Sequence, residues 1–99
     1  MIEVEYSSKK LKRVCTDAEY AVKQYGREMA LKIHQRIDQI SSAISVEMLV
    51  QYKVGRCHAL KGNLKGKYAM DLGEPYRLVF QKIDNCTVKV EILEIVDYH

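Results

Sequence analysis

The sequence predicts one α+β domain in which two helices cover one face of a single sheet. Apolar residues alternate with polar ones at the start of the chain and again over its last third, which is typical of half-buried strands. Between these stretches, apolar residues recur at the three- and four-residue spacing of helices. A length of 99 residues suits one core without disulfides or a metal, so we expect a single domain over residues 1–99.

The first half of the chain is predicted to be a strand followed by a two-helix hairpin. Apolar and acidic residues alternate over 2–6 and indicate the strand. A first helix is expected over 8–25, with a cap at Ser7-Ser8, the spacing of a capping box at 16–19 and a stop at Gly26. A second helix should run over 27–44. The apolar stripe of the second helix is expected to consist of Met29, Ile33, Ile37, Ile40 and Ile44. Its outer face is expected to carry Arg27, Lys32, Gln35, Arg36 and Gln39.

The second half is predicted to contain three strands in an antiparallel meander. Residues 45–57 show no clean period, and we expect a short turn of helix followed by a loop. Over residues 67–96 the period becomes two, with turns at 73–75 and 84–85. These strands should join the first one in a single sheet, with helices on one face and the other face partly open. Ile92-Leu93 interrupts the alternation and predicts a bulge or a strand buried on both faces.

Composition indicates a folded cytoplasmic protein. A hydrophobic content of 47% and a charged content of 29% argue against disorder. No stretch approaches the roughly 20 apolar residues of a membrane span, so no membrane partner is expected. The acidic, alternating start differs from the basic and then apolar start of a signal peptide. The cysteines lack CxxC spacing and suit a reducing compartment; they are Cys15, Cys57 and Cys86.

Positive charge gathers in one segment, although the net charge of +3 is by itself a weak argument for nucleic acid. Residues 53–67 contain no acid and five basic side chains, namely Lys53, Arg56, Lys61, Lys65 and Lys67. His58 lies in the same segment. Gly62 and Gly66 allow a positive φ and let a phosphate approach backbone N–H groups. The segment is either a phosphate-binding loop that also carries an acid–base group, or a solvated basic loop that leads into a strand.

The last three residues, Asp97, Tyr98 and His99, form a second candidate group. They follow an apolar run, which should anchor them to the sheet. Cleavage of RNA without a metal needs a base for the 2′-hydroxyl, an acid for the leaving 5′-oxygen and cations for the phosphate. Histidine suits either proton role because it titrates near neutral pH. The alternative is a frayed, solvated tail.

Arg77 lies in the middle of a predicted strand, on the face opposite its apolar neighbours. A guanidinium there can bind a phosphate through two hydrogen bonds, or can form a cross-strand ion pair with Asp71. Metal binding is not expected, because no spacing of histidine and cysteine resembles a zinc site and the adjacent Cys57 and His58 would point apart. No other cofactor is expected. The remaining two cysteines should be small buried apolar side chains.

Three motifs stand out: RCHALKGNLKG at residues 56–66, YRLVF at 76–80 and VDYH at 96–99. With Tyr25-Gly26 between the helices, they give the chain a resemblance to the RelE/ParE toxin superfamily, specifically to its HigB-like plasmid maintenance killer branch. The H-x-L-K-G-x-x-x-G segment combined with DYH is fairly specific, and the resemblance extends over essentially the whole chain. Some members carry further basic residues in the strand after the second glycine, where this chain has Ala69-Met70-Asp71.

The resemblance implies a RelE-like fold and a ribosome-dependent mRNA endonuclease of a type II toxin–antitoxin system. A helix-turn-helix, HigA-like antitoxin would neutralise it, and operator DNA would be bound only through the antitoxin complex. By position, the implied acid–base set is His58, Asp97, Tyr98 and His99. Lys61 and Arg77 would hold the scissile phosphate, with Lys65 and Lys67 as further RNA-binding residues. The alternatives are a ParE-like inhibitor of DNA gyrase and an inert binding module of the same fold.

Overall fold

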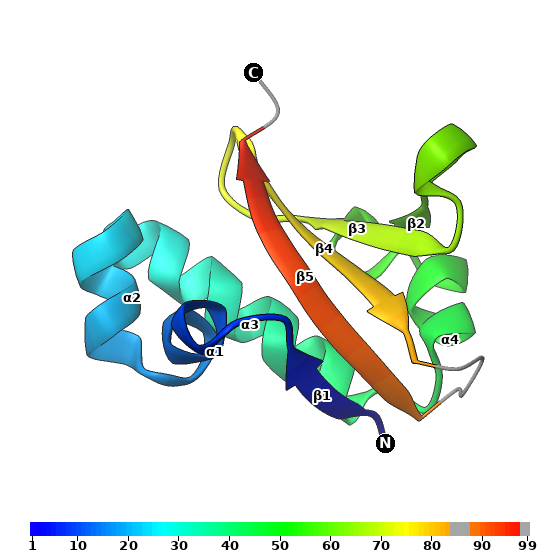
Figure 1. Cartoon of the computed structure of the whole chain (residues 1–99), viewed down its shortest axis with the longest axis horizontal. Coiled ribbons are helices and arrows are strands. Elements are labelled where there is room, and N and C mark those ends of the chain that lie inside the picture. The colour runs from blue at the N-terminus through cyan, green and yellow to red at the C-terminus, as the bar shows by residue number, and fades with distance from the viewer. Residues whose placement is uncertain (84–87, 98–99) are drawn as a thin grey trace.

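The computed structural model describes residues 1–83 and 88–97, and its layers are visible in Figure 1. In chain order the elements are β1 (Glu3–Tyr6), α1 (Lys9–Thr16), α2 (Ala18–Tyr25), α3 (Arg27–Ser42), α4 (Val46–Gln51), the 3₁₀ turn η1 (Val54–Arg56), β2 (His58–Ala59), the 3₁₀ turn η2 (Gly62–Leu64), β3 (Lys67–Asp71), β4 (Tyr76–Lys82) and β5 (Lys89–Asp97). Helices α1, α2 and α3 gather on one side of a twisted sheet, and α4 lies near the end of β4, where Glu47 pairs with Lys82.

The sheet is mixed and its five strands lie in the order β1-β5-β4-β3-β2. Strands β3, β4 and β5 form the predicted antiparallel meander. Strand β1 joins it by pairing in parallel with β5. The two-residue strand β2, which the hydrophobic periodicity did not predict, pairs with the outer edge of β3. The α+β class and the single sheet are therefore confirmed.

The helical layer differs from the predicted two-helix hairpin. The expected helix over 8–25 is broken at Asp17, which has extended backbone angles and belongs to neither α1 nor α2. Its N–H donates to the carbonyl of Arg13 at 2.9 Å, which closes α1. Its carboxylate accepts from the N–H of Tyr20 at 3.2 Å, which starts α2. A local cap thus replaces one long helix with two short ones.

The core lies between α3 and the helix side of the sheet. Ile33 and Ile40 are fully buried and meet Leu78 and Phe80 of β4 in one cluster. Ile37 is only half-buried at the margin of this cluster. The predicted stripe is wrong at its end: α3 stops at Ser42, so Ile44 lies outside the helix with 68% of its surface exposed. The expected short helix in residues 45–57 is confirmed as α4.

The opposite side of the sheet is the open face. Ala69 and Val79 are buried there but lie outside the apolar core cluster, because they alternate with the core-facing residues of β3 and β4. The predicted bulge is confirmed in β5. Val79 pairs with Glu94 whereas the next residue of β4 pairs with Ile92, which leaves Leu93 as the extra residue.

Arg36 was expected on the outer face of α3 and is instead buried, with 9% of its surface exposed. The reason lies at the edge of β3. Because β2 begins only at His58, which pairs with Ala69, the outer-edge carbonyl of Asp71 has no partner on that strand. The Arg36 guanidinium satisfies it, since Nε donates to this carbonyl at 2.6 Å while Nη1 donates to Gln39 at 3.0 Å.

No helix in the described part of the chain is both long enough and apolar enough to cross a bilayer.

Candidate functional site

The open face brings several predicted site residues together. His58 pairs in register with Ala69, which pairs with Val79, and Asp71 pairs with Arg77 two residues further along. Directly opposed residues point to the same side of a sheet, and so do residues two apart on one strand. His58, Asp71 and Arg77 therefore share the open face. The small side chains of Ala69 and Val79 form a buried apolar floor between them.

His58 has one ring nitrogen engaged. Its Nδ1 lies 2.9 Å from the backbone carbonyl of Arg56. A carbonyl oxygen only accepts hydrogen bonds, so Nδ1 carries the proton and donates. In the neutral ring Nε2 then holds the lone pair and can accept a proton. Because the side chain is exposed on a two-residue strand, a substrate can approach it from solvent.

Arg77 forms the cross-strand ion pair that sequence considerations left open. Its Nε lies 3.6 Å from Oδ1 of Asp71, and 35% of the side chain remains exposed. The second carboxylate oxygen, Oδ2, lies 3.3 Å from Nε of Arg56. Arg56 was not among the predicted site residues. Its pairing depends on contact between η1 and β3, fifteen positions apart in the sequence, which no local pattern reveals.

The three predicted RNA-binding lysines surround η2. Lys61 and Lys65 are exposed, whereas Lys67 begins β3 and is half-buried. A hydrogen bond of 2.9 Å from the N–H of Leu60 to the carbonyl of Lys67 closes this loop. Gly62 and Gly66 both have positive φ, at 68° and 95°, as the sequence suggested. No atom lies within 4 Å of a Cβ built at either glycine, so backbone conformation alone requires them.

Asp97 ends β5 on the other side of the sheet. Its register partner is Tyr76, whose ring contacts Tyr25 of α2 with 5.7 Å between centroids. Alternation along β4 puts Tyr76 on the helix side and its neighbour Arg77 on the open face. Asp97 therefore lies toward the helix side, not beside His58. The other two members of the predicted acid–base set lie outside the described residues; they are Tyr98 and His99.

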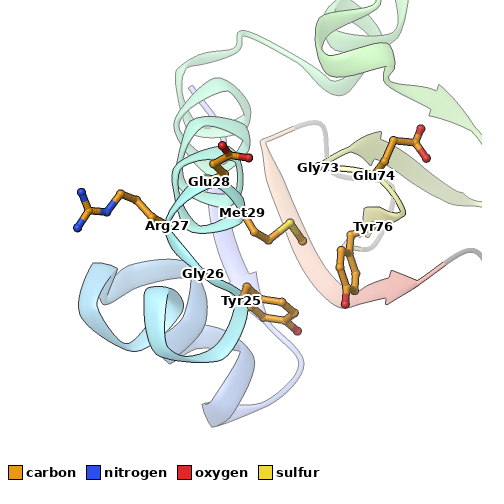
Figure 2. A pocket seen from close by; sticks show the side chains of 8 residues that line it. All are labelled: Tyr25, Gly26, Arg27, Glu28, Met29, Gly73, Glu74 and Tyr76. Atoms are coloured by element: carbon orange, nitrogen blue, oxygen red, sulfur yellow. The ribbon is translucent and has the colours of Figure 1, made fainter.

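A cavity of about 410 Å³ lies where the α2–α3 junction faces the β3–β4 turn. Figure 2 shows the rings of Tyr25 and Tyr76 approaching one another across it, with Met29 extending from α3 toward the β3–β4 turn and Arg27 pointing away. Burial, together with the neighbouring Tyr76, raises the pKa of Tyr25. Among the described residues, no predicted site residue lines this cavity, so it is separate from His58, Asp71 and Arg77 on the open face.

The cysteines in the described residues are structural. Cys57 precedes His58 but is buried, and burial raises the pKa of its thiol to about 12. Burial raises the pKa of Cys15 to the same value, which confirms it as a small apolar side chain. Cys86 lies outside the described residues. Across residues 1–83 and 88–97, no three side chains of His, Cys, Asp or Glu come together as a metal site.

No protein-family model and no curated protein matches this sequence. Solved structures do match its fold. The YoeB–YefM complex from Staphylococcus aureus aligns with a TM-score of 0.63 and 24% identity, over 100% of this chain and 98% of the other. A YoeB/ParE toxin from Agrobacterium tumefaciens gives 0.66 and 14%, over 99% and 100%. A YafQ variant from E. coli gives 0.51 and 15%, over 99% and 94%.

These structural neighbours are toxins of the RelE/ParE superfamily, and the chain has their fold over its whole length. The RelE-like fold expected from the resemblance is therefore confirmed. The assignment to the HigB-like branch stays a prediction.

Proposed function

We propose that this chain is the toxin of a type II toxin–antitoxin system and that it cleaves mRNA on the ribosome. One observation carries the proposal: on a sheet with the YoeB fold, His58 and Arg77 share the open face, and His58 keeps Nε2 as a proton acceptor. A base and a phosphate-binding cation on one face are the two groups that RNA cleavage by internal attack needs first.

In the proposed reaction, His58 acts as the general base. Nε2 takes the proton of a 2′-hydroxyl, whose oxygen attacks the adjacent phosphorus. The new O2′–P bond forms as the P–O5′ bond breaks, which gives a 2′,3′-cyclic phosphate and a 5′-hydroxyl. Arg77 and Lys61 bind the negative charge that develops on the phosphate oxygens. Lys65 and Lys67 would bind neighbouring phosphates, because both lie on the segment that adjoins His58 in the fold.

The leaving 5′-oxygen also needs a proton. We assign this step to the C-terminal residues Tyr98 and His99, among which His99 is the natural acid because an unperturbed imidazole titrates near neutral pH. Asp97, which lies toward the helix side, is not assigned a step. Since all of these steps use side chains, cleavage should continue in EDTA when polyamines keep the ribosome intact.

The partners follow from the same proposal. S. aureus YoeB has been solved in complex with YefM, which supports an antitoxin partner here, and we propose a helix-turn-helix antitoxin of the HigA-like kind. Operator DNA would be bound through the toxin–antitoxin complex. The ribosome would position the mRNA, because a small domain of net charge +3 binds RNA weakly on its own. The protein would then act in the cytoplasm.

The test is to map new RNA 5′ ends after adding the purified protein to a translation reaction. We expect cleavage of translated mRNA and far less cleavage of the same RNA without ribosomes. A supercoiling assay with DNA gyrase runs in parallel. Intact transcripts together with inhibited supercoiling would overturn the nuclease assignment and favour a gyrase inhibitor.

A further inference from the structure

The carboxylate of Asp71 lies between two arginines on the open face. Oδ2 is 3.3 Å from Nε of Arg56 and Oδ1 is 3.6 Å from Nε of Arg77. We call Arg56, Asp71 and Arg77 the arginine–aspartate triad. The Asp71 side chain is 24% exposed, whereas that of Arg56 is 82% exposed. The carboxylate is thus held in the sheet, while one guanidinium extends over it toward solvent.

The backbone around Arg56 is built to present this side chain. Gly55 and Arg56 both have positive φ, at 56° and 58°, a region that an ordinary side chain such as that of Arg56 adopts only at an energetic cost. The Arg36 side chain packs against Gly55 in this turn. A Cβ at Gly55 would lie 2.6 Å from Nε of Arg36, the same atom that donates to the backbone carbonyl of Asp71. One buried arginine therefore fixes both η1 and the strand that carries Asp71.

Two guanidinium groups repel one another unless an anion lies between them. Asp71 supplies that anion in the free protein, through two oxygens that each face one arginine. A phosphate offers oxygens of the same kind to the same two cations. The triad keeps a net charge of +1, so an RNA phosphate is still attracted to it.

Resting on the proposed function, we propose that Arg56 is a further phosphate-binding residue of the nuclease and that Asp71 is a positioning residue. Asp71 holds Arg56 beside Arg77, and the backbone carbonyl of Arg56 holds His58. His58, which takes the proton, and the two arginines, which bind the phosphate charge, are thereby held in fixed positions relative to one another.

This arrangement gives Asp71 two effects of opposite sign. Its negative charge weakens the binding of RNA phosphate, whereas its position keeps both guanidinium groups where turnover needs them. In Asp71→Asn we expect KM to fall about fivefold, because one negative charge near the phosphate is removed. We expect kcat to fall about tenfold, because the arginines are no longer held in place. Damage to the fold would not lower KM.

The experiment measures kcat and KM for cleavage of ribosomes that carry one defined mRNA. In Arg56→Ala we expect kcat/KM to fall about 10- to 100-fold, the effect of losing one charged hydrogen bond. Arg56→Lys should recover part of it. The matched control is Arg13→Ala, which also removes an exposed arginine paired with an aspartate, but on α1; it should cleave as the wild type does. Asp71→Glu keeps the charge and should keep the wild-type KM.

Arg56→Ala with wild-type kcat/KM would overturn the role of Arg56. Asp71→Asn with a raised KM, or with unchanged kcat, would overturn the positioning role. If Asp71→Asn does not fold, Asp71→Glu decides instead: a KM that falls despite the retained charge contradicts the proposal. A wild-type protein that cleaves no translated mRNA would overturn the proposed function together with this inference, whereas wild-type cleavage with full activity in Arg56→Ala overturns only the inference.

Discussion

The two faces of the sheet are formed by the same strands, but they depend on different interactions. On the helix side, Leu78 and Phe80 of β4 are completely buried against α3. On the open face, the neighbouring Arg77 pairs with Asp71 above a floor of Ala69 and Val79. The helix side depends on filled volume, so it tolerates exchange among apolar residues of similar size. The open face depends on charge and proton affinity, so it does not tolerate such exchanges.

The comparison therefore predicts that substitutions on the two faces separate activity from stability. Open-face substitutions should change cleavage and leave unfolding nearly unchanged. Helix-side substitutions should do the reverse.

The largest expected effect is at His58. His58→Ala should lower the rate of cleavage of translated mRNA by about 10²–10⁴-fold, the usual contribution of one positioned base. The melting temperature should stay within a few degrees, because the side chain is exposed. Both quantities are measured on the same preparation. His34→Ala is the control, since His34 hydrogen-bonds to the carbonyl of Val14 in the helical layer and should not affect the rate. Wild-type cleavage by His58→Ala would contradict the assignment of activity to the open face and of stability to the helix side.

The next effect belongs to the helix side. Ile33→Ala should lower the free energy of unfolding by about 2–5 kcal/mol, through lost burial and the cavity left behind. Urea titration measures it. Leu31→Ala on the same helix should change stability by less than about 0.5 kcal/mol, because 68% of Leu31 is exposed. If the two substitutions had equal cost, α3 would not pack as described.

A smaller effect should appear at alkaline pH. Burial raises the pKa values of Cys15 and Cys57 from 9.0 to about 12. Both thiols contribute their full stabilisation below pH 9, and lose it as pH rises toward 12, since the unfolded chain ionises first. At pH 10 the loss should be on the order of 1 kcal/mol per thiol. Urea titrations at pH 7.5 and pH 10 measure it, and Cys57→Ala should remove the share of one thiol. Burial also raises the pKa of Tyr6, to about 12, so Tyr6 contributes in the same direction. A flat profile would mean that the thiols are open to solvent.

The smallest effect concerns the ion pair between Glu47 of α4 and Lys82 of β4. The hydrogen bond from Lys82 lowers the pKa of Glu47, so the pair stabilises the fold above the ordinary carboxyl pKa and is lost as pH falls through the lowered one. The Glu47 side chain is 56% exposed, and exposed pairs contribute about 0.2–1 kcal/mol. Glu47→Gln should therefore cost at most that much at pH 7, and the cost should disappear as pH falls through the lowered pKa of Glu47. A larger cost would make α4 a main support of the sheet.

Much of the fold was predictable, because periodicity reports which face of an element is buried. The alternation in residues 67–96 predicted β3, β4 and β5, and its interruption predicted the bulge at Leu93. Residues 16–19 have the spacing of a capping box, but one helix was expected over 8–25 because the apolar pattern continues across Asp17. Its carboxylate instead starts α2 through one side-chain hydrogen bond. Strand β2 was missed because two residues have no period.

The candidate site was predictable only in part, because residue type does not reveal tertiary pairing. His58 and Arg77 were identified from their chemistry, and they share a face. Arg56 was passed over because its contact with Asp71 depends on a positive φ and on packing between distant segments. Arg36 was expected in solvent because the strand carbonyl that it binds lies 35 residues away.

The parallel pairing of β1 with β5 also sets an order of assembly during synthesis. Glu3 pairs with Lys89, so β1 must wait until 86 further residues have been made. Such a distant contact forms late, after local helices. While it waits, the exposed Glu3 and Glu5 on β1 oppose premature pairing with other chains, as charges on an unpaired strand do. Because β4 also lacks its second neighbour until β5 arrives, a growing chain cannot complete the sheet under the proposed site while β5 is still unsynthesised.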